Sequence, residues 1–112
     1  MWALLHDASE AYLTDVAKPI KPILVGYDHI EDRLMSAICE RFGLPKDQPA
    51  SVKIADMIML ATEQRDLLCS PPAEWTQTKG VTPAAWGIVP WFPKHAKNKF
   101  LERFYQLYEG EK

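Results

Sequence analysis

The chain has 112 residues, enough for one hydrophobic core, and its 47% hydrophobic and 25% charged content is typical of a globular protein. Its formal net charge of −2 and its lack of a basic stripe argue against nucleic-acid binding. No apolar run approaches the ~20 residues of a membrane-spanning helix, and two cysteines are too few for a disulfide framework. We therefore expect a single reduced, cytoplasmic domain over residues 1–112 with no membrane partner.

The first half of the chain predicts two helices joined by a proline-containing loop. Residues 2–13 combine good helix formers with no Gly or Pro. Residues 14–25 contain two prolines and cannot continue that helix. Apolar residues at helical spacing then predict a second helix that starts at residues 26–28 and stops at Gly43.

The second half predicts two more helices separated by a long loop. Ser51 is a favourable N-cap for a helix that runs to about Leu68, and a final amphipathic helix begins at Lys94. Residues 70–93 contain five prolines, two glycines and three tryptophans, and we expect an ordered loop that shields its tryptophans from water. The predicted fold class is all-α, a bundle of about four helices with this Pro- and Trp-rich loop before the last one.

Ionisable residues interrupt the apolar pattern at two points. His6, Asp7 and Glu10 lie within five residues of one another, and positions three and four apart share a helix face. Asp56 lies among Ile, Ala and Met residues in the third predicted helix. Ionisable groups on buried faces are costly unless they pair or bind metal. If the first and third helices pack together, His6, Asp7 and Asp56 could surround one Mn, Co, Ni, Zn or Fe ion.

The order of these residues resembles the HD superfamily of metal-dependent phosphohydrolases, in particular its small bacterial and phage members that act on deoxynucleotides. The likeness runs from Trp2 to about Leu68. It rests on Leu5-His6-Asp7-Ala8-Ser9-Glu10-Ala11-Tyr12, on Asp15 and Lys21, and on Lys53-Ile54-Ala55-Asp56. A His-Asp pair alone would be a weak signal, whereas the pair followed by these residues in this order is much stronger.

The resemblance implies a role for each matched residue. His6, Asp7 and Asp56 would bind a divalent ion, either one of the transition metals named above or Mg. Glu10 would orient or deprotonate the attacking water, and Asp15 would assist the water or the leaving group. From the residues alone, the alternative is that Asp15 is only a turn residue.

The resemblance also implies a substrate that carries phosphate. Lys21 would bind that phosphate, and Lys53 is a second candidate because it shares a helix face with Asp56; either could instead be a solvated surface lysine. Family members carry Gly-Asp-x-Pro-x-Pro-x-Lys where this chain reads Thr14-Asp15-Val16-Ala17-Lys18-Pro19-Ile20-Lys21, so one Gly and one Pro are replaced. We expect a nucleotide phosphohydrolase, chiefly for deoxynucleoside 5′-monophosphates, with a deoxynucleoside triphosphate triphosphohydrolase as the close alternative.

The chain departs from the family at one ligand. The family places a further histidine on a helix upstream of the His-Asp pair, and neither His29 nor His95 matches it in order, so both are expected on the surface. We therefore expect an N-terminally shortened HD domain with weaker metal binding and exposed apolar surface, which favours a homodimer or swapped assembly. The rival hypothesis is a catalytically impaired helical module for interaction or oligomerisation. Glu63, Arg65 and Asp66 are expected to be charges on the surface of a helix.

Overall fold

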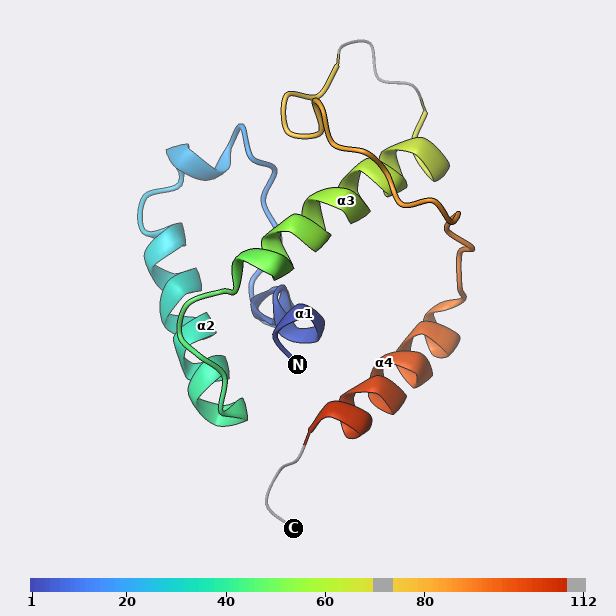
Figure 1. Ribbon diagram of the computed structural model, residues 1–112. Helices are drawn as coiled ribbons and strands as arrows, with labels where there is room; N and C mark the ends of the chain where they lie inside the picture. Colours follow the sequence, from blue (N-terminus) through green and yellow to red (C-terminus); the bar gives the residue numbers. More distant parts are fainter. Residues whose placement is uncertain (70–73, 109–112) are drawn as a thin grey trace. The chain divides into compact units, whose positions relative to one another are not determined.

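The computed structural model describes residues 1–69 and 74–108, and that part of the chain is all-helical (Figure 1). Its α-helices are α1 (Trp2–Leu5), α2 (Tyr27–Phe42), α3 (Ala50–Asp66) and α4 (Pro93–Leu107), and its 3₁₀ helices are η1 (Ala8–Ala11) and η2 (Lys21–Ile23). No strand occurs in these described ranges, which confirms the predicted fold class. No helix among them is long and apolar enough to cross a membrane.

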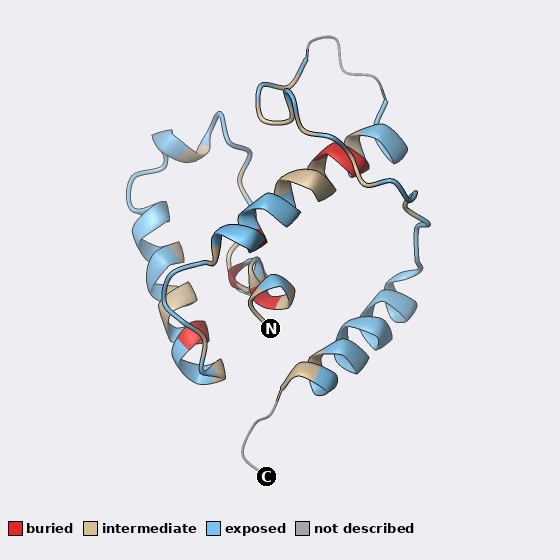
Figure 2. Ribbon diagram, in the orientation of Figure 1, coloured by how far each residue is buried: buried red, intermediate tan, exposed pale blue. Residues whose placement is uncertain are grey.

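The helical elements belong to two compact units. The first unit draws on Met1–Gln48 and Phe100–Lys112, and the second on Pro49–Lys99. In the first unit, η1 packs against α2, and the buried residues are Leu5, Ser9, Ile38 and Cys39. In the second unit, the buried residues Val52, Ala61 and Thr62 all lie on α3 (Figure 2).

The predicted continuous helix over residues 2–13 is wrong, because the chain turns at His6 and Asp7. Asp7 has φ −105° and ψ 19°, in the sparsely populated region between the helical and extended basins. The His6 side chain bonds through Nδ1 to the Ala3 carbonyl oxygen at 2.9 Å. This carbonyl is one of the last four of α1, which lack partners within the helix. A side chain thus satisfies the end of α1, and η1 starts on a new axis.

Helix α2 confirms the second predicted helix. Gly26 precedes it with φ 84°, and Gly43 ends it with φ 64°. The Leu44 amide then bonds to the Cys39 carbonyl at 2.8 Å, which is the Schellman pattern that a left-handed glycine permits. At this end, Phe42 makes edge-to-face contacts with Phe104 and Tyr108 of the chain's C-terminal part, with ring centroids 5.7 and 5.8 Å apart.

Helix α3 starts slightly earlier than predicted. Pro49, with extended ψ of 138°, precedes it, and the Val52 amide bonds to the Pro49 carbonyl at 3.0 Å. Ser51 is therefore inside the first turn, and the prediction of Ser51 as N-cap is wrong. The bond to Pro49 supplies the first-turn acceptor, so a serine cap is not needed.

Residues 84–88, which lie between α3 and α4, are held to α3 by hydrogen bonds between side chains of that helix and main-chain groups. Thr62 Oγ1 accepts a bond from the Ala84 amide at 2.9 Å, and Arg65 donates to the carbonyls of Ala84 and Trp86, each at 2.8 Å. The Ile88 amide donates to Asp66 Oδ2 at 2.8 Å. Arg65 and Asp66 are exposed on the surface of α3, as predicted, and they also fasten this segment.

The tryptophans of this segment differ from expectation. Trp86 and Trp91 are 58% and 55% exposed, so the prediction that they are shielded is wrong, whereas Trp75 is half-buried. Bonds to the main chain hold the segment, so its indole rings do not need to anchor it. The part of the predicted loop at residues 70–73 lies outside the described residues.

Apolar side chains are exposed on many of the described elements, as predicted. The buried hydrophobic residues are Leu5, Ile38, Cys39, Val52 and Ala61. Larger side chains such as Ile23, Val89 and Phe92 are 74%, 75% and 87% exposed.

Candidate metal site

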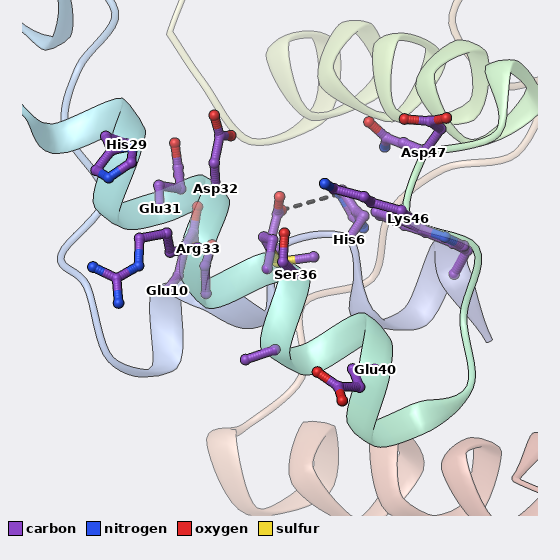
Figure 3. Close-up of a pocket in the computed structure, with 16 residues that line it drawn as sticks. His6, Glu10, His29, Glu31, Asp32, Arg33, Ser36, Glu40, Lys46 and Asp47 are labelled. Carbon is purple, nitrogen blue, oxygen red and sulfur yellow. Dashed lines mark ion pairs between the residues drawn. The ribbon is translucent and has the colours of Figure 1, made fainter.

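His6 and Asp7 are adjacent in sequence, so their side chains would diverge in a continuous helix. The turn after α1 brings the two side chains together instead. His6 Nε2 lies 3.0 Å from Asp7 Oδ2, the ion pair drawn as a dashed line in Figure 3. The opposite ring nitrogen, Nδ1, bonds to the Ala3 carbonyl oxygen at 2.9 Å and must carry a proton to do so. His6 Nε2 is therefore the ring nitrogen that lies against the Asp7 carboxylate. A second proton on the ring, or a cation between Nε2 and Oδ2, would make this contact attractive.

The orientation of the His6 ring matches one that is common among metal-binding histidines. Histidines that bind metals commonly donate their other N–H to a backbone carbonyl, which fixes the tautomer and the ring. Two neighbouring ligands of an octahedral ion, with bonds of about 2.1 Å, lie about 3.0 Å apart. The same bonds in a tetrahedral site would separate them by about 3.4 Å. The separation of 3.0 Å between His6 Nε2 and Asp7 Oδ2 equals that of neighbouring octahedral ligands, and it is also the ordinary length of an N–H···O hydrogen bond.

The third predicted ligand, Asp56, lies on α3 with its side chain exposed. It belongs to the second unit, whereas His6 and Asp7 belong to the first. Taken by itself, the described part of the first unit contains no group of three or more His, Cys, Asp or Glu side chains placed to hold a metal ion. That these three residues share one ion stays a prediction.

Glu10 lies on η1, in the same groove as the pair. Partial burial raises the pKa of its carboxyl above the usual range, and repulsion from Asp7, Asp15 and Glu31 raises it further, while His6 opposes the shift. A carboxylate whose pKa is raised is a better acceptor for a proton from water. Asp15 follows η1 in the exposed loop, close enough to contribute to this repulsion.

The pair and Glu10 line a cavity of about 850 Å³ whose walls come from the α1–η1 turn, α2 and residues 46–48 (Figure 3). Its carboxylates are those of Asp7, Glu10, Glu31, Asp32, Glu40 and Asp47, and its fixed cations are Arg33 and Lys46. We call this cavity the acidic groove. Its charge attracts cations and repels phosphate, so an anionic substrate would need a bound cation there.

The two lysines predicted to bind phosphate lie in different places. Lys21 Nζ is 2.6 Å from Glu31 Oε2 and 5.3 Å from the centroid of the Tyr27 ring. The hydrogen bond to Glu31 is the main cause that raises the pKa of Lys21. A phosphate would compete with Glu31 for this amine. Lys53 is exposed on α3, in the second unit.

Sequence reasoning missed the connection between α2 and α3 as part of the groove. Lys46, Asp47 and Gln48 all line it. The indole Nε1 of Trp2 donates to the Pro45 carbonyl at 2.8 Å and so holds this connection against α1. No local pattern signals such a contact, because 43 positions separate Trp2 from Pro45. The exposed His29 also lines the groove, and the exposed His95 makes an edge-to-face contact with Trp91.

Comparison with known proteins relates the chain to two bacterial proteins. "Uncharacterized protein YfdR" of Escherichia coli is 42% identical over 112 aligned residues, which cover 98% of this chain and 62% of YfdR. "Uncharacterized protein RCAP_rcc00048" of Rhodobacter capsulatus is 48% identical over 54 residues, 47% of this chain and 28% of that protein. The chain thus spans less than two thirds of the length of either relative. No family model matches the chain, and no solved structure matches it significantly.

Proposed function

We propose that this chain is a metal-dependent phosphohydrolase of the HD type that acts on nucleotides, with deoxynucleoside 5′-monophosphates as its expected substrates. The observation that supports this most strongly is the His6–Asp7 pair. Its nitrogen and oxygen are 3.0 Å apart, and the Ala3 carbonyl orients the ring so that Nε2 faces Asp7. The bond to Ala3 fixes the ring orientation that metal-binding histidines commonly have, in addition to satisfying a carbonyl at the end of α1.

Three residues would hold the ion. They are His6 through Nε2, Asp7 through Oδ2, and Asp56 as the third ligand that the family resemblance implies. When bound, a divalent ion supplies positive charge that polarises a phosphate ester and makes water more acidic. Glu10, whose pKa is raised, accepts the proton of the attacking water. Asp15, near Glu10, assists that transfer.

Metal binding and phosphate release test the proposal together. We expect the purified chain to bind Mn²⁺ in calorimetry and, with Mn²⁺ or Co²⁺, to release inorganic phosphate from a deoxynucleoside monophosphate. Asp7→Asn keeps the side-chain shape but removes the anionic ligand, and we expect metal affinity to fall at least ~10-fold. Asp28→Asn is the matched control, because Asp28 is exposed on α2 and outside the groove.

Several outcomes would contradict the proposal. A wild-type chain that binds none of Mn²⁺, Co²⁺ or Ni²⁺ and releases no phosphate from a deoxynucleotide panel refutes it. Activity that survives Asp7→Ala would come from another site or a contaminant. Release of tripolyphosphate from deoxynucleoside triphosphates, without action on monophosphates, would instead identify a triphosphohydrolase.

A second candidate function is a helical module for interaction or oligomerisation. The observation that favours it is the exposure of large apolar side chains, among them Ile23, Val89 and Phe92. Such a module would associate in a concentration-dependent way in light-scattering measurements and would bind no metal. A metal-binding monomer would exclude it.

A further inference from the structure

Phosphate entering the acidic groove would meet six carboxylates and two fixed cations among the described lining residues. Since phosphate and carboxylates repel each other, the substrate needs a cation beside its reacting group as well as the metal. Arg33 and Lys46 are the two cations available. Figure 3 shows Arg33 directed toward the side of the groove where His29 lies, away from His6. Lys46 comes from the connection between α2 and α3, which forms another wall of the groove.

A hydrogen bond ties the connection that carries Lys46 to the helix that precedes the His6–Asp7 pair. Trp2 Nε1 donates to the carbonyl of Pro45, the residue immediately before Lys46, at 2.8 Å. His6 has helical dihedrals (φ −60°, ψ −31°), so it lies one turn after Trp2 on the same face of α1. The bond from Trp2 to Pro45 thus ties the connection that carries Lys46 to α1, and Trp2, His6 and Lys46 all line the groove.

Lys46 also differs chemically from Lys21, the lysine to which the family resemblance assigns phosphate binding. The Lys21 amine already pairs with Glu31 at 2.6 Å, so its charge is offset within the protein. Lys46 is exposed on a connection between helices, with a flexible stem that ends in a compact charge. An amine of this kind can reach one phosphoryl oxygen without the planar fit that an arginine requires.

We propose that Lys46 binds the phosphoryl group of the substrate next to the His6–Asp7 pair, and that Trp2 positions it through the Pro45 carbonyl. This role rests on the proposed phosphohydrolase function. In this proposal the α2–α3 connection supplies the phosphate contact, because the Lys21 amine is paired with Glu31.

The test replaces Lys46 with a neutral side chain of similar length. For Lys46→Met in the full chain, we expect KM for a deoxynucleoside monophosphate and the inhibition constant of inorganic phosphate to rise roughly 10- to 100-fold. The Mn²⁺ affinity should not fall, because Lys46 is not a ligand. Lys46→Arg should recover part of the loss. Lys18→Met is the matched control, since Lys18 is exposed in the same unit and outside the groove, and its KM should stay at the wild-type value.

Trp2→Phe tests the positioning role separately. It keeps an aromatic ring and removes the N–H that bonds to Pro45. We expect KM to rise in the same direction as for Lys46→Met but by less, with Mn²⁺ affinity unchanged. In Lys46→Met, the dependence of KM on ionic strength should also flatten, because salt screens a charge contact at an exposed site.

The outcomes separate this proposal from the function on which it rests. A wild-type chain without metal binding or phosphatase activity refutes both. An active wild-type chain whose Lys46→Met variant keeps its KM and its phosphate inhibition overturns the role of Lys46 alone. A loss of Mn²⁺ affinity in Lys46→Met would also overturn that role, because it would show that the substitution disturbs the metal site.

Discussion

Thr62 is the point where α3 holds the segment that leads toward α4, and it offers a stringent test of the described contacts. Its side chain is fully buried, at 0% exposure. Its hydroxyl donates to the Ile58 carbonyl at 2.6 Å and accepts from the Ala84 amide at 2.9 Å. Thr62→Val replaces that hydroxyl with a methyl group of similar size and leaves the Ala84 amide facing carbon.

The expected cost follows from the two bonds. The Ile58 carbonyl remains within the hydrogen-bond ladder of α3, so losing the donated bond costs little. The Ala84 amide loses its acceptor in a half-buried position, which costs about 2 kcal/mol in the free energy of unfolding. Thr62→Ser keeps both bonds and removes one methyl group, at a cost of about 1 kcal/mol. Thr62→Val should therefore be the less stable variant although it is the more hydrophobic one.

Urea unfolding followed by circular dichroism measures the difference in stability, and thermal unfolding should show a decrease of about 10 °C for Thr62→Val. Amide hydrogen exchange adds a local measurement. The Ala84 amide should be protected in the wild type and in Thr62→Ser and should exchange faster in Thr62→Val. If Thr62→Val is as stable as Thr62→Ser and Ala84 stays protected, the hydroxyl does not hold this segment.

Two further predictions concern carboxyl groups with shifted pKa values. The bonds from Arg65 and then from the Ile88 amide lower the pKa of Asp66 to about 2, so its stabilisation is complete above its ordinary pKa near 4 and is lost as the pH falls through about 2. Asp66→Asn should therefore lower the urea midpoint at pH 7, and its deficit against the wild type should shrink between about pH 4 and about pH 2; a deficit that is the same at both pH values would contradict this role. In the metal-free chain, NMR titration should place the pKa of Glu10 above that of an ordinary glutamate, and Asp15→Asn should lower it, because Asp15 is one of the charges that raise it. No change in Asp15→Asn would show that the two carboxylates do not interact.

Local patterns predicted the helices well where one residue decides the boundary. Gly43 ends α2 because a left-handed residue is needed there, and Gly requires no side-chain room in that conformation. Apolar spacing likewise predicted α3 and α4 to within a few residues. The N-terminus of α3 was missed by two residues because the Pro49 carbonyl, and not a serine hydroxyl, receives the first bonds.

Contacts between distant residues were beyond local patterns. Arg65 and Asp66 look like a solvated pair on a helix, yet their partners are main-chain groups about twenty positions later. The acidic groove gains Lys46 in the same way, through a bond between Trp2 and Pro45. Hydrophobic periodicity reports which face of a helix is apolar, and it carries no information about which loop lies against that face.

The sequence by itself determined that the chain is helical and that a histidine, an aspartate and a glutamate cluster near Ala8, because composition, spacing and glycine stops are local properties. Only the tertiary structure decided how that cluster is presented. A continuous helix would separate His6 and Asp7 by roughly 100° around its axis. The bond from His6 to the Ala3 carbonyl and the unusual dihedrals of Asp7 turn the chain instead, and they bring the two side chains to 3.0 Å.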